Sequence, residues 1–104
     1  MTGGREAAVR SVLESLLTRR CYEFRWGKER CLIQPDNNKG CDYLSLWRTD
    51  PSPACLGRAL YEVMDGFDAD TVRELLEQPC IRGKSYLERL AAGELTDENG
   101  EELP

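Results

Sequence analysis

The stretch from Cys21 to Arg48 constrains the fold most, because its residues follow the pattern of an antiparallel meander. Apolar and polar side chains alternate up to Gly27-Lys28, a pair that suits a two-residue turn with glycine at the first central position. Folding about this turn predicts three cross-strand pairs: Trp26 with Glu29, Phe24 with Cys31, and Tyr22 with Ile33. The apolar members of these pairs then share one face of a hairpin.

A third strand is expected over residues 43–47, after a segment rich in turn formers over residues 35–40. Two leucines of this strand, Leu44 and Leu46, alternate with large aromatic side chains, which is typical of a strand covered partly on both faces. We assign Leu32, Leu44 and Leu46 to the second face of the sheet. That face is expected to be covered by C-terminal helices or left as a contact surface.

Helical periodicity and capping residues predict helices on both sides of the meander. Residues 5–20 carry apolar side chains at helical spacing and end in two arginines, where the helix dipole favours cations. Further helices are predicted to begin at Ser52-Pro53, at Asp68 and at a capping box opened by Ser85. The predicted fold class is α+β: an N-terminal helix, a three-stranded antiparallel meander, then two or three C-terminal helices packed mainly on one sheet face.

A chain of 104 residues fits one domain that can bury a core without metal or disulfide staples. We expect a single compact domain over residues 1–95. The acidic segment 96–104 is too poor in apolar residues to pack and is expected to be a disordered tail.

The charge is unevenly distributed along the chain. Lys and Arg exceed Asp and Glu by two in residues 1–50, whereas the acidic residues exceed the basic ones by seven in residues 51–104. The net charge of −5 disfavours bulk affinity for nucleic acid or anionic membranes but allows a local basic patch. There is no apolar run of the roughly 20 residues that span a bilayer, and no export signal, so we expect a cytoplasmic protein without membrane contact.

The sequence lacks the constellations that usually carry catalysis, so we expect no enzymatic activity, no cofactor and no metal site. Five cysteines occur without any histidine and without a Cys-x-x-Cys pair, which is typical of reduced, mostly buried thiols. Cys80 lies beside Arg82 and Lys84, whose charges would lower the pKa of a thiol, but no histidine is present to act as a base. Capping explains Asp68 without a bound cation.

Residues 19–30 interleave basic and aromatic side chains, a composition found in sheets that bind single-stranded nucleic acid. Strand alternation places the aromatic rings on one face and Arg25 with Arg30 on the other. The order helix, three strands, helix also resembles the topology of double-stranded-RNA-binding domains over roughly the first 65 residues. This resemblance would imply RNA binding. Those domains carry a lysine-rich start to their second helix, whereas residues 52–58 contain one basic residue, Arg58.

The leading functional hypothesis is a non-enzymatic module that binds or regulates a protein partner. It follows from the missing catalytic constellation and from the spare apolar residues of the second sheet face. The expected contact residues are Leu32, Leu44, Leu46 and Trp47, with Arg25 and Arg30 at the rim.

Two alternative functional hypotheses rest on charged side chains. In the first, the basic-aromatic hairpin binds nucleic acid, with phosphate contacts from Arg19, Arg20, Arg25, Lys28 and Arg30. In the second, the acidic half of the chain presents carboxylates where a nucleic-acid-binding enzyme expects phosphates, as inhibitors carried by phages and other mobile elements do. The residues for this inhibitor hypothesis are Asp68, Asp70, Glu74 and Glu77.

Overall fold

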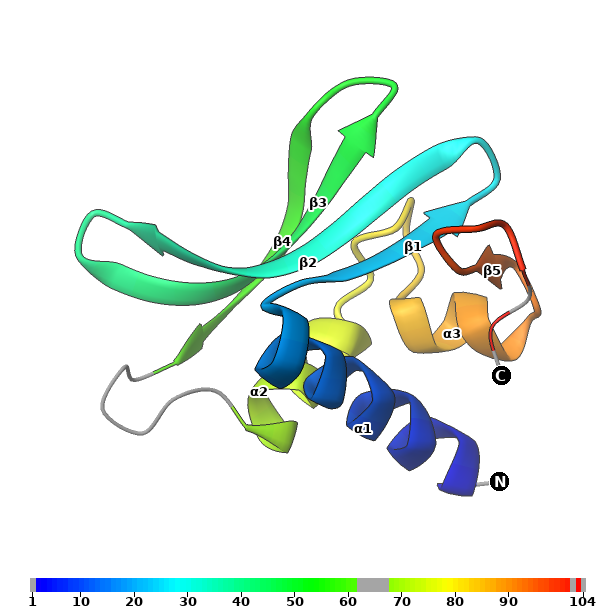
Figure 1. Ribbon diagram of the computed structural model, residues 1–104, viewed down its shortest axis with the longest axis horizontal. Coiled ribbons are helices and arrows are strands. Elements are labelled where there is room, and N and C mark those ends of the chain that lie inside the picture. Colours follow the sequence, from blue (N-terminus) through cyan, green and yellow to red (C-terminus); the bar gives the residue numbers. More distant parts are fainter. Residues whose placement is uncertain (1, 62–67, 102, 104) are drawn as a thin grey trace.

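The meander of the sequence forms the centre of a curled antiparallel sheet, and the helices lie together on one side of it (Figure 1). The computed structural model describes residues 2–61, 68–101 and 103. Within these ranges the sheet has five strands in the order β4-β3-β2-β1-β5. Their bounds are β1 (Tyr22–Trp26), β2 (Glu29–Asn38), β3 (Cys41–Asp50), β4 (Ala54–Tyr61) and β5 (Leu95–Thr96). The predicted α+β class is confirmed.

The first helix, α1 (Thr2–Arg19), is present as predicted and lies beneath the sheet. Its buried side chains are Ala8, Val9, Val12 and Leu16. Leu17, one of the apolar residues in the predicted helix, is 60% exposed. The buried stripe is therefore rotated toward the alanine side of the helix, where small side chains allow close approach.

The register of the first hairpin is confirmed at all three predicted pairs, Trp26–Glu29, Phe24–Cys31 and Tyr22–Ile33. Gly27 has a φ of 61°, as the first central position of this turn requires. The second hairpin is longer than predicted: β2 continues to Asn38, and the turn contains only Lys39 and Gly40, both with positive φ. This tight turn sets the register that pairs Ile33 with Leu46.

The predicted helix over residues 53–65 is wrong for the residues that the structure describes, because residues 54–61 form strand β4. Its remaining residues, 62–65, lie outside the described ranges. Ala59 and Tyr61 point to the core side, and the strand completes the hydrogen bonding of β3. Pairing with a neighbouring strand has overridden the local helix signals. The topology of double-stranded-RNA-binding domains, which needs a helix here, is therefore not formed.

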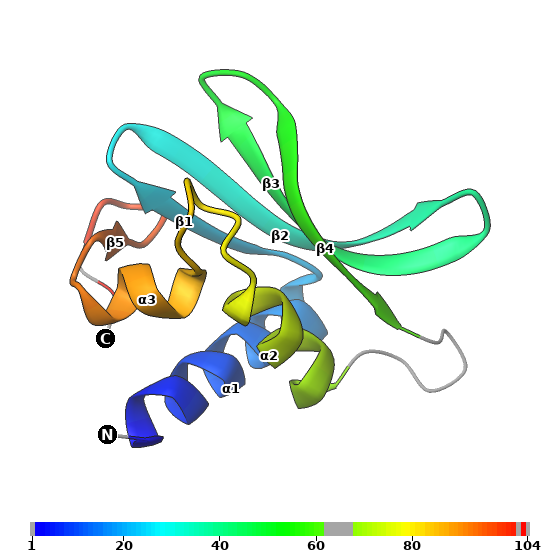
Figure 2. The same ribbon diagram turned by 180° about the vertical axis from the view of Figure 1, so that it is seen from behind.

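The two C-terminal helices begin where the capping residues predict. Helix α2 (Ala69–Glu77) starts after Asp68, whose carboxylate accepts from the backbone N–H groups of Asp70 and Thr71. Helix α3 (Tyr86–Ala91) starts after Ser85, and Glu88 completes the capping box. Both helices cover the same face of the sheet as α1, as the view from behind also shows (Figure 2).

Residues 96–101 and 103 of the segment expected to be a disordered tail contact the rest of the fold, and residues 102 and 104 lie outside the described ranges. Thr96 pairs with Arg25 in the β1–β5 ladder. Beyond it, Asp97 N–H donates to the carbonyl of Glu101 at 2.7 Å, which closes a turn. Leu103 packs against the core.

Candidate functional site

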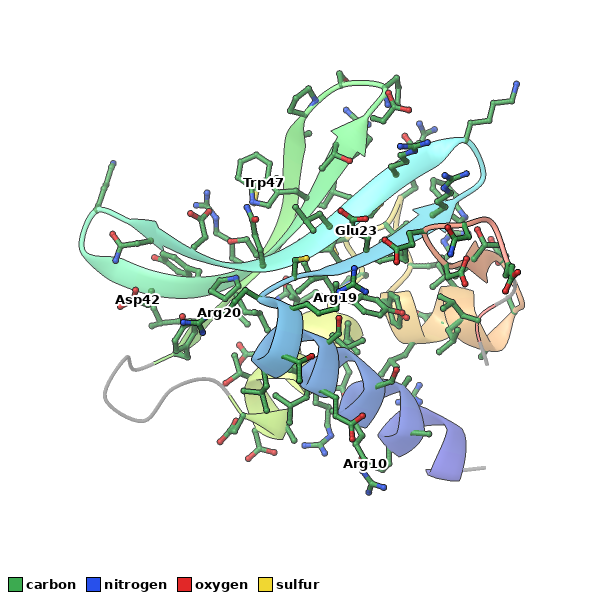
Figure 3. All side chains as sticks on the ribbon, in the orientation of Figure 1. Arg10, Arg19, Arg20, Glu23, Asp42 and Trp47 are labelled. Carbon is green, nitrogen blue, oxygen red and sulfur yellow. The ribbon has the colours of Figure 1, made fainter. Side chains whose placement is uncertain are left out.

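One face of the sheet is covered by the helices and the other is open (Figures 1 and 2). The register arranges the open face in rows across the strands, because residues paired across a sheet share a face. These rows, from the β1–β2 turn inward, are Arg25 with Arg30; Glu23 with Leu32 and Trp47; Gln34 with Ser45 and Arg58; and Asp36 with Tyr43 and Leu60. In Figure 3, Glu23 and Trp47 extend from the sheet on the side away from α1, whereas Arg10 points outward from α1.

Leu44 and Leu46 do not belong to this open face. Both are fully buried in the core, next to Ile33. The prediction that they form a contact surface is therefore a mistake of register. The sequence predicts a loop over residues 35–40, so it does not fix which residues of the second and third strands pair. In the structure, the tight turn at Lys39-Gly40 fixes this pairing and places both leucines on the covered face. Leu32 keeps its predicted place on the second face, and Trp47, an expected contact residue that alternates with these leucines, lies opposite it in the ladder.

Three buried side-chain atoms in the described part of the chain have no hydrogen-bond partner: Arg25 Nε, Trp47 Nε1 and Arg58 Nε. All three belong to residues of the open face. A buried donor without an acceptor costs about 1–3 kcal/mol, so such groups are uncommon in folded proteins. Each of these atoms has less than 1 Å² of accessible surface, so neighbouring side chains of the protein enclose it.

Two arginines, Arg25 and Arg30, face each other directly across β1 and β2. Like charges in this position are unfavourable unless other groups compensate. Among the ion pairs of the described residues, none includes Arg25 or Arg30. A hollow beside the two arginines is also lined by Glu23 and Glu98, and Asp50 lies opposite Arg30 in the β2–β3 ladder. This end of the face therefore holds two arginines with three carboxylates near them, although no ion pair among the described residues joins them.

At the other end of the face, the guanidinium of Arg58 lies 5.5 Å from the centre of the Tyr43 ring. This cation–π contact holds the arginine over β3. Leu60, in the next row, is 57% exposed. Asp36 is the nearby acid on this face, and its carboxylate accepts from Ser45 at 3.5 Å. This end of the open face therefore carries aromatic and apolar side chains together with the guanidinium of Arg58.

The aromatic side chains of the basic-aromatic hairpin lie on the covered face. Phe24 is 1% exposed, and Tyr22 and Trp26 pack against the core. They cannot stack on bases without a rearrangement of the helices. Of the basic residues proposed as phosphate contacts, Arg19 lies 3.6 Å from Glu98, while Arg25 and Arg30 lie on the open face. The remaining two, Arg20 and Lys28, are exposed.

Trp26 forms the centre of a second charged cluster, on the covered side of the β1–β2 hairpin. The guanidinium of Arg89 lies 4.5 Å from the centre of the Trp26 ring and donates to Glu94 at 2.8 Å. Arg89 also donates twice to the carbonyl of Ile81. Hydrogen bonds from Trp26 and Arg89 hold the pKa of Glu94 below its usual value. Because its charges are paired internally, this cluster is part of the structure rather than a ligand site.

The four carboxylates of the inhibitor hypothesis are brought together on α2 and its cap. Asp68 accepts the capping hydrogen bonds, and these bonds lower its pKa. Asp70 binds Arg73 at 2.6 Å, and Arg73 reaches on to Glu6 of α1. Glu74 and Glu77 are exposed. These acids lie on the helical side of the molecule, away from the open sheet face.

All five cysteines are free thiols. Cys31 is buried, and burial together with nearby Glu29 raises its pKa to about 12. Burial also raises the pKa of Cys80, opposite to the direction that its basic neighbours in sequence suggest. Cys41 and Cys55 are exposed, so the thiols are less buried than the sequence predicts.

Over the described ranges, no group of three or more His, Cys, Asp or Glu side chains is placed to hold a metal ion. No helix there is long and apolar enough to cross a membrane. No family model matches the chain, and neither a curated protein nor a solved structure is found to be similar to it.

Tyr43, Arg58 and Leu60 lie on the open face but are not among the contact residues that the sequence predicts. The sequence predicts a helix that contains Arg58 and Leu60, and it places Tyr43 on the face opposite to Leu44 and Leu46 without including it among the contact residues. The alternation of Arg58-Ala59-Leu60-Tyr61 is a strand signal that could have revealed them.

Proposed function

We propose that the protein is a non-enzymatic binding module that recognises a protein partner through the open face of its sheet. The half-buried Leu32 and Trp47 and the exposed Leu60, gathered on a sheet face that the helices leave open, are the observation that carries this proposal. A partner that covers the face would remove these apolar side chains from water. Large aromatic side chains such as Trp47, with arginines beside them, are also the residues that most often anchor protein interfaces.

The revised contact set keeps Leu32, Trp47, Arg25 and Arg30 and adds the three newly found residues, Tyr43, Arg58 and Leu60. Leu32 and Trp47 are paired neighbours at the centre of the face, where interface side chains contribute most. The charged groups at the border would set specificity and the rate of association.

Affinity capture with quantitative mass spectrometry tests this proposal. A Leu32→Ser/Trp47→Ser variant should lose the partners that the wild type retains, because the centre of the interface is gone. Arg10→Ser, on the far side of α1, is the matched surface control and should retain them (Figure 3). Near-ultraviolet circular dichroism verifies folding of both variants. Equal capture by the wild type and the double variant would overturn the proposal.

The inhibitor hypothesis is a special case of partner binding that uses a different surface. Its test in the same capture assay is Asp70→Asn/Glu74→Gln/Glu77→Gln, which leaves the capping Asp68 intact. Loss of partners in this variant, with retention by Leu32→Ser/Trp47→Ser, would move the interface to α2.

Nucleic-acid binding remains the second candidate because Arg25 and Arg30 form a cationic pair on the open face. Fluorescence anisotropy with short single- and double-stranded DNA and RNA tests it. Binding that falls steeply with salt and is lost in Arg25→Glu/Arg30→Glu would support this function. The absence of binding at low salt, where phosphate attraction is strongest, would remove it.

A further inference from the structure

Strand β4 forms one edge of the described sheet, since the strand order places β3 alone beside it. The other edge is β5, which has two residues, whereas β4 has eight. An edge strand presents backbone N–H and C=O groups that no neighbouring strand pairs, and these groups can receive a strand of another chain. The sheet therefore has one edge that is long enough for such pairing.

The ladder shows which backbone groups of β4 point outward, because successive residues of a strand direct their hydrogen-bonding groups to alternate sides. Pro35 of β2 lies opposite Leu44 and has no N–H, and Leu44 directs its groups the other way, toward Ala59 of β4. Arg58 and Leu60 flank Ala59 in the strand. They therefore direct their N–H and C=O groups away from β3, to the open edge.

A side-chain contact supports this orientation. Gln78 Nε2 donates to the carbonyl of Arg58 at 2.7 Å, which is accessible to it at the edge of the sheet. Among the described residues, no other group outside the ladder bonds to the backbone of Arg58 or Leu60. The Arg58 carbonyl has a second lone pair, so it can accept one more hydrogen bond. The outward groups of both residues are thus available to an incoming strand.

Strand β4 lacks the features by which edge strands usually prevent association, which are lysines, prolines and charges that twist or solvate the edge. Its eight residues include neither lysine nor proline, and Arg58 is its one charged residue. The guanidinium of Arg58 lies 5.5 Å from the centre of the Tyr43 ring on β3, so it is directed away from the edge. Leu60, beside it, is 57% exposed. A long edge of this kind favours self-association.

The regular part of β4 is compatible with pairing to itself. The ladder with β3 is regular over residues 57–61, which follow an irregularity opposite Leu46 and Trp47. Two antiparallel copies of this stretch, centred on Ala59, bring Arg58 of one copy opposite Leu60 of the other. No like charges meet in this arrangement. Because the short β5 offers no second edge of this length, the assembly closes as a two-fold symmetric dimer.

We propose that β4 pairs antiparallel with β4 of a second copy of the chain, so that the sheets of the two copies join into one continuous sheet. The inference goes beyond the proposed function, because it assigns a second interaction surface with a different occupant. A dyad perpendicular to the sheet keeps the helices of both copies on one side. The two open faces then lie next to each other, which allows a partner with two binding sites to engage both.

Sedimentation velocity of the full chain, from micromolar to millimolar concentration, tests this pairing. A reducing agent is present throughout, because Cys41 and Cys55 are exposed and could link copies by a disulfide. The expected result is a change from monomer to dimer without larger species. Leu60→Lys should weaken dimerisation about tenfold or more, because two symmetry-related contacts are lost and lysine disfavours edge pairing.

Leu17→Lys is the matched control for this substitution. Leu17 is 60% exposed and lies on α1, whereas Leu60 is 57% exposed and lies on β4. The control should therefore dimerise as the wild type does. Near-ultraviolet circular dichroism verifies that both variants are folded.

Amide hydrogen exchange distinguishes strand pairing from other contacts between copies. Dimerisation should protect the N–H groups of Arg58 and Leu60, which point to the edge. It should leave the N–H of Ala59 unchanged, because this group is already directed to Leu44 in the β3–β4 ladder. Protection of other segments without these two amides would overturn the inference.

Two further results would also overturn it. One is a chain that stays monomeric at millimolar concentration, and the other is equal dimerisation of Leu60→Lys and Leu17→Lys. Protection of Arg58 and Leu60 only after a captured partner is added would assign the edge to a strand of another protein instead of a second copy.

The Leu32→Ser/Trp47→Ser variant separates this inference from the proposed function. Neither residue lies on β4, so the variant should dimerise as the wild type does while it loses its captured partners. Loss of dimerisation in this folded variant would show that the copies associate through the open face, and would overturn the inference.

Discussion

The hydroxyl oxygens of Tyr22 and Tyr86 lie 2.6 Å apart, and this hydrogen bond joins the first strand to the last helix across 64 positions of the chain. The Tyr86 ring also packs edge-on against Phe24, with ring centres 4.9 Å apart. The covered face of the sheet is thus fixed to its helices by both polar and aromatic contacts. This rigid side supports the open face behind it.

The tyrosine pair predicts a loss of stability at high pH. Burial raises the pKa of Tyr22 and of Tyr86 above the usual value of about 10. A raised pKa in the folded state means that its stabilising contribution is complete below pH 10 and is lost as pH rises beyond it. Urea unfolding between pH 8 and pH 11 should show this decline. It should be smaller in Tyr22→Phe/Tyr86→Phe, and an equal decline in that variant would contradict the assignment.

Gly57 on β4 predicts a steric effect. A Cβ atom at this position would lie 2.7 Å from Gln78 Oε1 and 3.1 Å from Cys80 Sγ. Gln78 cannot simply move away, because its Nε2 donates to the carbonyl of Arg58 at 2.7 Å. We expect Gly57→Ala to lower the free energy of unfolding by about 1–3 kcal/mol, measured by urea denaturation.

Gly4 is the matched control for this substitution. It lies in α1, and a Cβ atom added there would meet nothing within 4 Å, so Gly4→Ala should raise the free energy of unfolding by about 0.5–1 kcal/mol. If Gly57→Ala were as well tolerated as Gly4→Ala, the close approach of the α2–α3 connector to β4 would be refuted.

The two faces of the sheet predict opposite responses to leucine truncation. Leu44 is fully buried, so Leu44→Ala should cost about 2–5 kcal/mol of unfolding free energy. Leu60 is 57% exposed, so Leu60→Ala should change it by less than about 0.5 kcal/mol. Thermal and urea unfolding of both variants measure this difference. If Leu44→Ala were as stable as the wild type, the burial of Leu44 would be contradicted, and the exposed position predicted from the sequence would be supported.

We predict that the planar geometry of the Arg89 guanidinium contributes to the stability of the fold, in addition to its charge. Its side chain donates to the carbonyl of Ile81 and to Glu94, and it lies over the Trp26 ring. Lysine cannot make these contacts together, so Arg89→Lys should destabilise the fold by about 2 kcal/mol. Arg82, which is exposed and also lies near Trp26, is the control. Arg82→Lys should cost less than about 1 kcal/mol, and equal losses would contradict this account.

Local signals were sufficient to predict several elements. Gly27 defines the first turn and therefore the pairing of Phe24 with Cys31. Asp68 and Ser85 cap their helices through hydrogen bonds to residues two or three positions away. These features depend on neighbours in sequence, so the sequence alone contains the information needed to locate them.

The predictions were wrong where contacts between residues distant in the sequence determine the structure. Ser52-Pro53 and the leucines that follow resemble a helix start, yet residues 54–61 pair with β3 because that strand would otherwise present an open edge. Leu44 and Leu46 were placed on the wrong face because a shift of one residue exchanges the faces of a strand. The contact surface could be predicted only in part for the same reason. Leu32 and Trp47, two of the expected contact residues, lie on the open face, whereas the position of Arg58 depends on β4.

The central claim is that the partner covers the open face, and acrylamide quenching of tryptophan fluorescence tests it most directly. Trp26→Phe leaves Trp47 as the sole tryptophan, and Trp47→Phe leaves Trp26. The account predicts that a saturating amount of the captured partner reduces quenching of Trp47 and leaves quenching of Trp26 unchanged. Unaltered quenching of Trp47 in a complex that forms normally would show that the partner binds elsewhere and would contradict the claim.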